Sequence, residues 1–269
     1  MYLEIFHYSF MVRAFIAGSV IGIIAPLIGS FLVTRRYALM ADSLAHISLA
    51  GIAVGLLIGV YPVYTALLVT IVSAIIIEWL RSERKISGEI ALAMFLSGGL
   101  AVAIVLISLA RGFNVDLFSY LFGSITTVRN IDLWVMGILG LTVMLTVYFF
   151  YEEFLYISFS EEAAKVSGIP VRMLNIVLVV LTAITVSLSI RIVGLLLIGA
   201  LMVIPVVTAM QIAKSFIQTI LYAACFGIVS VLSGLFISYY LDLAAGGTIV
   251  VVSLILFGLT SIVAGRKIL

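Results

Sequence analysis

Charged residues are scarce in this chain of 269 residues: they make up 10% of the sequence, whereas 65% of it is hydrophobic. A soluble domain carries about 25% charged residues, so the composition excludes that class of protein. It indicates an integral membrane protein in contact with the lipid bilayer. The formal net charge of +2 gives no sign of a nucleic-acid partner, and we expect none.

Several kinds of chemical site are also missing. The only cysteine, Cys225, excludes a disulfide framework and a thiolate metal cluster. There is no HExxH motif of a zinc peptidase and no GxxxxGK[ST] motif, and no lysine follows a glycine. We therefore expect no enzymatic activity in this chain, so that energy for uphill transport would come from a partner or an ion gradient.

Long apolar runs divide the chain into candidate membrane spans, each long enough to cross about 30 Å of hydrocarbon as a helix. They predict an all-α, polytopic membrane protein with about nine transmembrane helices, within a range of about eight to ten. The expected spans cover residues 10–33, 38–60, 62–80, 90–110, 131–151, 172–190, 192–210, 216–241 and 247–265.

Basic residues predict how these spans are oriented. Ten of the 14 lysines and arginines fall on one side, and Arg13, Arg111, Arg129 and Arg191 fall towards the other. Basic residues are enriched in cytoplasmic loops, so the first group predicts an N-terminus outside and a C-terminus in the cytoplasm. Arg191 lies between two spans, where it could repel cations or anchor the helix ends, and we expect it to anchor them at the outer surface by snorkelling.

Two outer segments are neither polar loops nor full spans. Residues 111–130 favour an interfacial or re-entrant segment, with a plain amphipathic loop as the alternative. Its aromatic side chains would lie at headgroup level: Phe113, Phe118, Tyr120 and Phe122. Asp242 lies shortly before the last span, and we expect it to cap that helix, with a role in metal capture as the alternative.

One span carries two ionisable residues, Asp42 and His46, four positions apart. On a helix this spacing places both side chains on one face, where a divalent cation could bridge them. A carboxylate and an imidazole suit Zn²⁺, Mn²⁺ or Fe²⁺ better than Mg²⁺ or Ca²⁺. Because ionisable residues in spans commonly mark a substrate path, we expect transported metal at this pair and no permanently bound cofactor.

Two ligands do not complete a metal site. A twofold dimer with this helix near its axis would supply two of each, so we expect a homodimer. Two alternatives remain open from the residues alone. Asp42 and His46 could bond only to each other and join spans by about 1 kcal/mol, or they could serve a secondary metal/proton transporter that has no ATPase.

The opposite face of the same helix carries glycines at every fourth position, Gly51, Gly55 and Gly59. This pattern is typical of helices that approach a neighbour closely in the membrane. We therefore expect all three glycines to lie at a helix-packing contact.

The longest polar interval runs over residues 151–172. Ser160 is placed to cap a short helix that begins with Glu161, and Gly168 followed by Pro170 would end it. On the predicted topology this segment is cytoplasmic. A short capped helix there indicates a docking surface, with a solvated connector that has no partner as the alternative.

Several segments resemble one known family. ADSLAHISLAGIAVG is similar to the signature of the permease subunits of bacterial and archaeal ABC importers for zinc and manganese. Ser43 and Ala45 stand where that signature usually shows alanine and serine, but both are small and neither needs to be a ligand. The resemblance continues in the family's order over nearly the whole chain, through NVDLFSYLFGSITTV, EEAAKVSGIPVRMLN, RIVGLLLIGALMVIPVVTA and YYLDLAAGGTIVV.

The resemblance implies a single transmembrane permease domain over residues 1–269, with a cytoplasmic coupling loop at about 152–171, in a prokaryotic plasma or inner membrane. It implies a homodimer, a cytoplasmic ATP-binding subunit and an extracytoplasmic metal-binding protein that lands near residues 111–130 and Asp242. Metal would pass Asp42 and His46 by alternating access. The residues expected to couple to the ATPase are Glu161, Glu162, Ala163, Ala164 and Gly168.

Overall fold

The computed structural model describes residues 7–83, 86–109, 117–124, 126 and 128–265, and its twelve regular elements there are all α-helices. Eight of them are long and apolar enough to cross a membrane. The helices are α1 (Ser9–Thr34), α2 (Leu39–Ile58), α3 (Pro62–Glu83), α4 (Gly88–Leu109), α5 (Leu117–Phe122), α6 (Asn130–Phe149), α7 (Tyr151–Phe159), α8 (Glu161–Val166), α9 (Val171–Ser189), α10 (Ile198–Met210), α11 (Phe216–Leu241) and α12 (Ala245–Val263).

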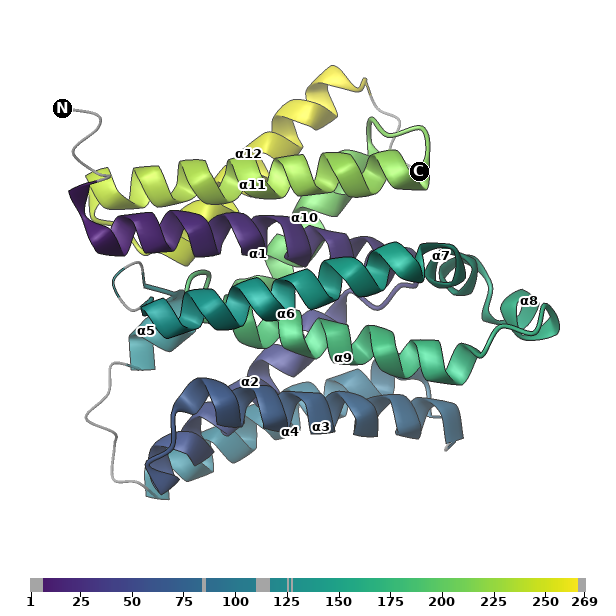
Figure 1. Cartoon of the computed structure of the whole chain (residues 1–269), viewed down its shortest axis with the longest axis horizontal. Coiled ribbons are helices and arrows are strands. Elements are labelled where there is room, and N and C mark those ends of the chain that lie inside the picture. The colour runs from purple at the N-terminus through teal and green to yellow at the C-terminus, as the bar shows by residue number, and fades with distance from the viewer. Residues whose placement is uncertain (1–6, 84–85, 110–116, 125, 127, 266–269) are drawn as a thin grey trace.

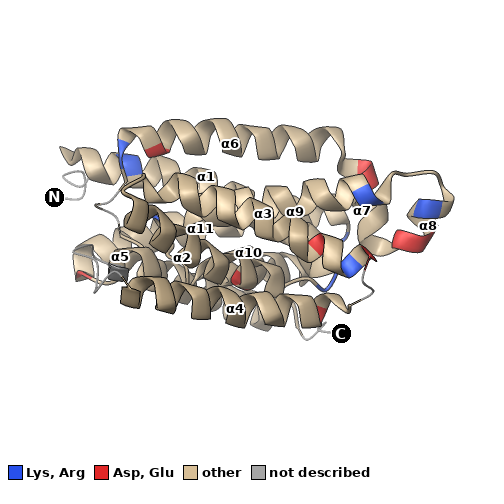
Figure 2. Ribbon diagram, turned by 90° about the horizontal axis from the view of Figure 1, so that it is seen from below, with Lys and Arg blue, Asp and Glu red and all other residues tan. Residues whose placement is uncertain are grey.

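The long helices lie roughly side by side, so the bundle has two ends (Figure 1). We name them the α5 end and the α8 end after the short helices that lie there. Helix α1 begins at the α5 end, and α12 ends towards the α8 end. Figure 2 shows lysine, arginine, aspartate and glutamate gathered mainly near these two ends, as expected when the middle of the bundle lies in hydrocarbon.

Eight of the nine expected spans are confirmed as long helices, and the expected span over residues 192–210 is not. The helix in that region, α10, has only 13 residues. At 1.5 Å per residue it rises about 20 Å, which is too short to cross the hydrocarbon by itself. Residues 190–197 form turns before it, so α10 begins inside the bundle.

The turn over residues 190–197 is held by backbone pairing with α5. The N–H of Leu195 donates to the carbonyl oxygen of Tyr120 at 2.9 Å. Gly194 has a φ of 84°, and a Cβ added there would lie 2.4 Å from the backbone nitrogen of Gly123. A continuous helix is therefore not formed in this stretch, because its backbone groups bond to α5 and one position accepts only glycine.

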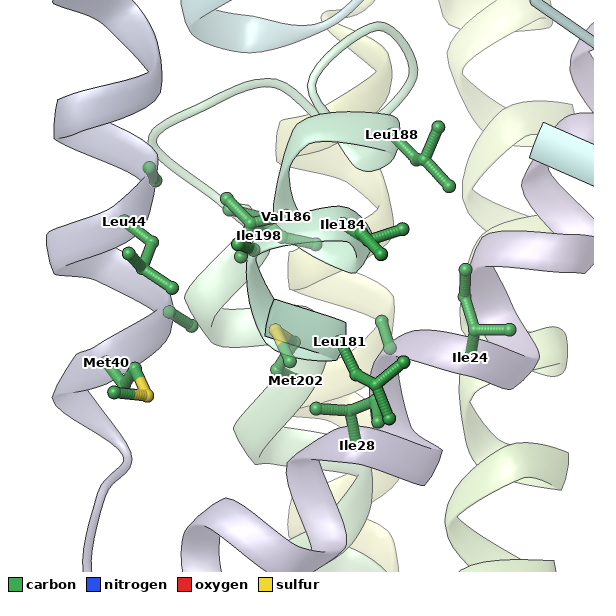
Figure 3. Close-up of a cluster of buried hydrophobic side chains, with 14 of the residues drawn as sticks. Ile24, Ile28, Met40, Leu44, Leu181, Ile184, Val186, Leu188, Ile198 and Met202 are labelled. Atoms are coloured by element: carbon green, nitrogen blue, oxygen red, sulfur yellow. The ribbon is translucent and has the colours of Figure 1, made fainter. Parts of the chain in front are cut away.

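The buried core lies where α1, α2, α9 and α10 meet, and it sets the position of α10. Figure 3 shows the side chains of α10 between those of α2 on one side and those of α1 and α9 on the other. The buried residues labelled there include Met40 and Leu44 of α2, Ile198 and Met202 of α10, Leu181 of α9, and Ile24 and Ile28 of α1. This apolar packing brings the first turn of α10 against the first turns of α2.

Candidate functional site

Asp42 and His46 lie one turn apart on α2, and both side chains are half-buried. Atom Nδ1 of His46 is buried and has no hydrogen-bond partner among the described residues. A buried polar atom without a partner is destabilising, so it is an unusual feature that points to a ligand. The alternative that Asp42 and His46 bond to each other is therefore not realised through Nδ1 of His46.

The carboxylate of Asp42 lies against the first turn of α10. A Cβ added at Gly199 would lie 1.9 Å from Oδ1 of Asp42, so only glycine leaves room for this approach. The N-cap residue of α10 is Leu197, whose side chain makes no capping hydrogen bond. The partial positive charge at a helix N-terminus stabilises a nearby carboxylate, so α10 positions and supports Asp42.

Gly199 was not among the expected site residues. The sequence offers only a weak signal for it, a glycine ahead of Pro205 in an apolar segment. Its role depends on the approach of α10 to α2, and that approach is a property of the folded bundle.

One copy of the chain supplies few metal ligands at this place. In the part of the chain that the structure describes, no group of three or more His, Cys, Asp and Glu side chains could hold a metal ion. Structural zinc sites use four ligands, and catalytic sites use three and one open position. Asp42 and His46 alone are therefore fewer ligands than such a metal site uses.

The glycine face of α2 meets α3 at two of its three positions. A Cβ at Gly51 would lie 2.7 Å from Cα of Ala66, and one at Gly55 would lie 2.2 Å from Oγ1 of Thr65. Gly59 departs from the expected packing role. It is the C-cap of α2, with a φ of 70° and no atom within 4 Å of an added Cβ, so it ends the helix instead.

The polar interval folds into two short helices, α7 and α8, at the α8 end (Figure 1). The expected cap is confirmed: the N–H of Ala163 donates to Oγ of Ser160 at 3.2 Å. Gly168 follows α8 with a φ of 80°, as a glycine that ends a helix commonly does. Helix α7 is anchored by Phe154, which is buried and lies 5.7 Å from Phe31 between ring centroids.

The expected coupling residues on α8 and just after it differ in burial. Ala164 is buried and Glu161 is half-buried, whereas Glu162, Ala163 and Gly168 are exposed. Val166 was not among the expected coupling residues, yet its side chain is 90% exposed. An apolar side chain so exposed on a short capped helix is typical of a surface that a partner covers.

At the α5 end, Arg191 is buried, so the expectation that it snorkels to the surface is wrong. Its Nη1 lies 3.6 Å from Oδ2 of Asp132, and its guanidinium lies over the rings of Tyr61 and Tyr120, at 5.2 and 5.7 Å. The Tyr61 hydroxyl donates to Oδ1 of Asp132 at 2.7 Å. Burial and this hydrogen bond raise the pKa of Tyr61 to about 12.

A cavity of about 630 Å³ opens beside this cluster. It is lined by three arginines, Arg13, Arg129 and Arg191, and by Tyr61 and Tyr120. Guanidinium groups in a cavity favour anionic groups such as carboxylates. Of the aromatic residues expected at headgroup level, Tyr120 lines this cavity. Phe113 and the side chain of Phe118 lie outside the described residues.

The expectation that Asp242 caps the last span is also corrected. Asp242 is the C-cap of α11, with a φ of 52°, and the N-cap of α12 is Ala244. The left-handed backbone at Asp242 ends α11, a conformation that aspartate adopts more readily than most residues.

The chain is similar to membrane proteins of metal transport systems. It is 38% identical over 248 residues to a probable metal transport system membrane protein of Treponema pallidum, covering 92% of this chain and 93% of that protein. It is 32% identical over 253 residues to the high-affinity zinc uptake system membrane protein ZnuB of Haemophilus influenzae, covering 94% of this chain and 97% of that protein.

A solved structure shares both the fold and the sequence pattern. The match is to PsaBC from Streptococcus pneumoniae in complex with Fab, with a TM-score of 0.88 and 31% identity, covering 99% of this chain and 98% of that chain. The model of the ABC 3 transport family matches residues 7–264. The chain is therefore a multi-pass membrane protein that belongs to the ABC 3 transport family.

Proposed function

We propose that this chain is the permease subunit of an ATP-driven importer of divalent transition metal ions, with zinc, manganese and ferrous iron as candidate substrates. The observation that carries this proposal is the half-site on α2, where His46 keeps a buried nitrogen without a partner and Asp42 is supported by α10. Family membership and the names of the relatives agree with it.

The transported ion would contact Asp42 and His46 on its way through the bundle. Both ligand types bind all three candidate metals, so the pair does not choose among them. A second copy of the chain, related by a twofold axis close to α2, would add the same two ligands. Four protein ligands would then surround the ion, and the pathway would belong to the homodimer.

Energy would come from a separate cytoplasmic ATPase, because this sequence has no P-loop. The docking surface would be the loop at about 152–171, with α8 as the contact and the α8 end facing the cytoplasm. Its capped first turn, its exposed Glu162 and its exposed Val166 support this assignment. Closure of the ATPases on ATP would move α8 and open the metal site inward by alternating access.

An extracytoplasmic metal-binding protein would land on the α5 end. The described part of residues 111–130 and the segment around Asp242 both lie there, beside the arginine-lined cavity. Acidic side chains of such a partner would match the three arginines.

Reconstitution in proteoliposomes with the ATPase and the binding protein tests this function. We expect uptake of one radiolabelled metal that stops when ATP is replaced by a non-hydrolysable analogue. Uptake that needs no ATP and follows an imposed proton gradient would contradict the proposal and favour a metal/proton exchanger. Competition among unlabelled Zn²⁺, Mn²⁺ and Fe²⁺ would name the substrate.

A further inference from the structure

Glu161, the first residue of α8, points into the bundle and contacts three other elements. Its carboxylate forms an ion pair with the Arg35 guanidinium at the end of α1. Arg81 of α3 donates to Oε2 at 3.2 Å, and the amide of Asn175 on α9 donates to Oε1 at 3.1 Å. A single side chain of α8 is thus bonded to three membrane-spanning helices or their ends.

The charges around Glu161 balance within a small cluster. Arg81 also forms two hydrogen bonds with the buried Glu78, at 2.9 and 2.6 Å, so two arginines face two glutamates. Burial alone would raise the pKa of Glu161, but Arg81 and Arg35 hold it below its ordinary value. Removal of this one charge would leave an uncompensated arginine in a partly buried place.

The same two arginines also contact a residue next to the start of α2, the helix that carries the proposed metal pair, Asp42 and His46. The guanidiniums of Arg35 and Arg81 lie over the ring of Tyr37, at 5.2 and 5.8 Å from its centroid. Tyr37 lies next to Ala38, the N-cap of α2, and its carbonyl oxygen accepts the N–H of Met40 at 3.0 Å. Asp42 follows in the first turn of α2.

We propose that Glu161 is a positioning residue: its ion pairs with Arg35 and Arg81 transmit a displacement of α8 to α2, the helix of the metal pair. Glu161 is then an internal link, and the partner ATPase contacts the exposed face of α8. This inference rests on the proposed docking of the ATPase at α8. Because helices are stiff and ion pairs of this kind are directional, a shift of α8 would move the start of α2.

The test uses Glu161→Gln, which keeps the size of the side chain and removes its charge. Uptake and ATP hydrolysis are measured together in proteoliposomes that contain the ATPase and the binding protein. We expect normal assembly with the ATPase and continued hydrolysis, with metal uptake per ATP lowered about fivefold or more, the scale of a typical coupling between sites. Glu89→Gln, an exposed glutamate at the same end, is the matched control and should leave the ratio unchanged.

A double variant separates transmission from simple support. If Glu161 acts through Arg35, Arg35→Gln should lower the ratio as well, and the double variant should be no worse than the more affected single variant. If Glu161→Gln fails to fold, Arg35→Gln carries the test, because it leaves Glu161 paired with Arg81.

Three results would overturn the inference. One is an unchanged ratio of uptake to hydrolysis in both single variants. Another is loss of ATPase binding in Glu161→Gln, which would make Glu161 a partner contact. The third is strict additivity of the two changes. Failure of the wild type itself to couple uptake to ATP would instead reject the proposed function, so the two failures are distinguishable.

Discussion

At the scale of single residues, the proposed metal pair of Asp42 and His46 depends on a glycine in another helix. Gly199 leaves the space that the carboxylate of Asp42 occupies, and a Cβ there would lie 1.9 Å from Oδ1. The nearest atoms belong to a side chain, so a methyl group would displace Asp42 without forcing the two backbones apart.

We expect Gly199→Ala to leave the protein folded and to raise the KM for metal uptake about tenfold or more, the usual effect of losing support around a metal ligand. Gly137→Ala, where no atom lies within 4 Å of the added Cβ, is the control. Equal KM values for the two variants would show that Asp42 does not need its present position.

The pH dependence of metal binding should report His46. Metal needs a neutral imidazole, so affinity should fall about tenfold per pH unit once the pH is low enough to protonate His46. Glu161 would not contribute, because a carboxyl with a lowered pKa stays ionised above its ordinary value of 4.5 and loses its effect only below it. Calorimetric titration that gives flat affinity across the pH range in which His46 becomes protonated would show that His46 is not a ligand.

At the scale of helices, the contact of α2 with α3 depends on the absence of side chains. Gly51 faces the backbone of α3, so Gly51→Ala would push the two helices apart. We expect a loss of about 1–3 kcal/mol, the range for overpacking, seen as a lower midpoint of thermal unfolding in detergent.

Gly98→Ala on α4 is the matched control for this contact, because nothing lies within 4 Å of its added Cβ. Alanine favours a helix over glycine by about 1 kcal/mol, so the control should be neutral or stabilising. A Gly51→Ala protein as stable as the control would mean that α2 and α3 separate easily.

The sequence predicts most of the helices, because long apolar runs and basic loops are local signals. The prediction of a span over residues 192–210 was wrong because residues 190–197 bond to α5. Pairing with a distant segment leaves no periodic pattern in the sequence. Likewise, Ser160 ahead of Glu161 predicts a capped helix but not that Glu161 faces inward, since a helix of six residues has no clear apolar stripe. The contacts of Arg191 with Tyr61, Tyr120 and Asp132 could not be predicted either, because these residues are far from Arg191 in the sequence.

At the scale of the whole molecule, three features lie in order from one end of the bundle to the other. The arginine-lined cavity is at the α5 end, the proposed half-site of Asp42 and His46 is on α2, and α8 lies at the opposite end. The sequence predicted the pair because both residues belong to one helix. It could not predict Gly199 or the cavity, because their parts come from separate elements.

The most direct test of the account is metal uptake by Asp42→Ala and His46→Ala, compared with wild type at matched expression in cells that carry the ATPase and the binding protein. We expect each variant to lose uptake of the same metal, while each still inserts in the membrane and assembles with the ATPase. Normal uptake by both variants would contradict the central claim, because the pair would then only pack the bundle.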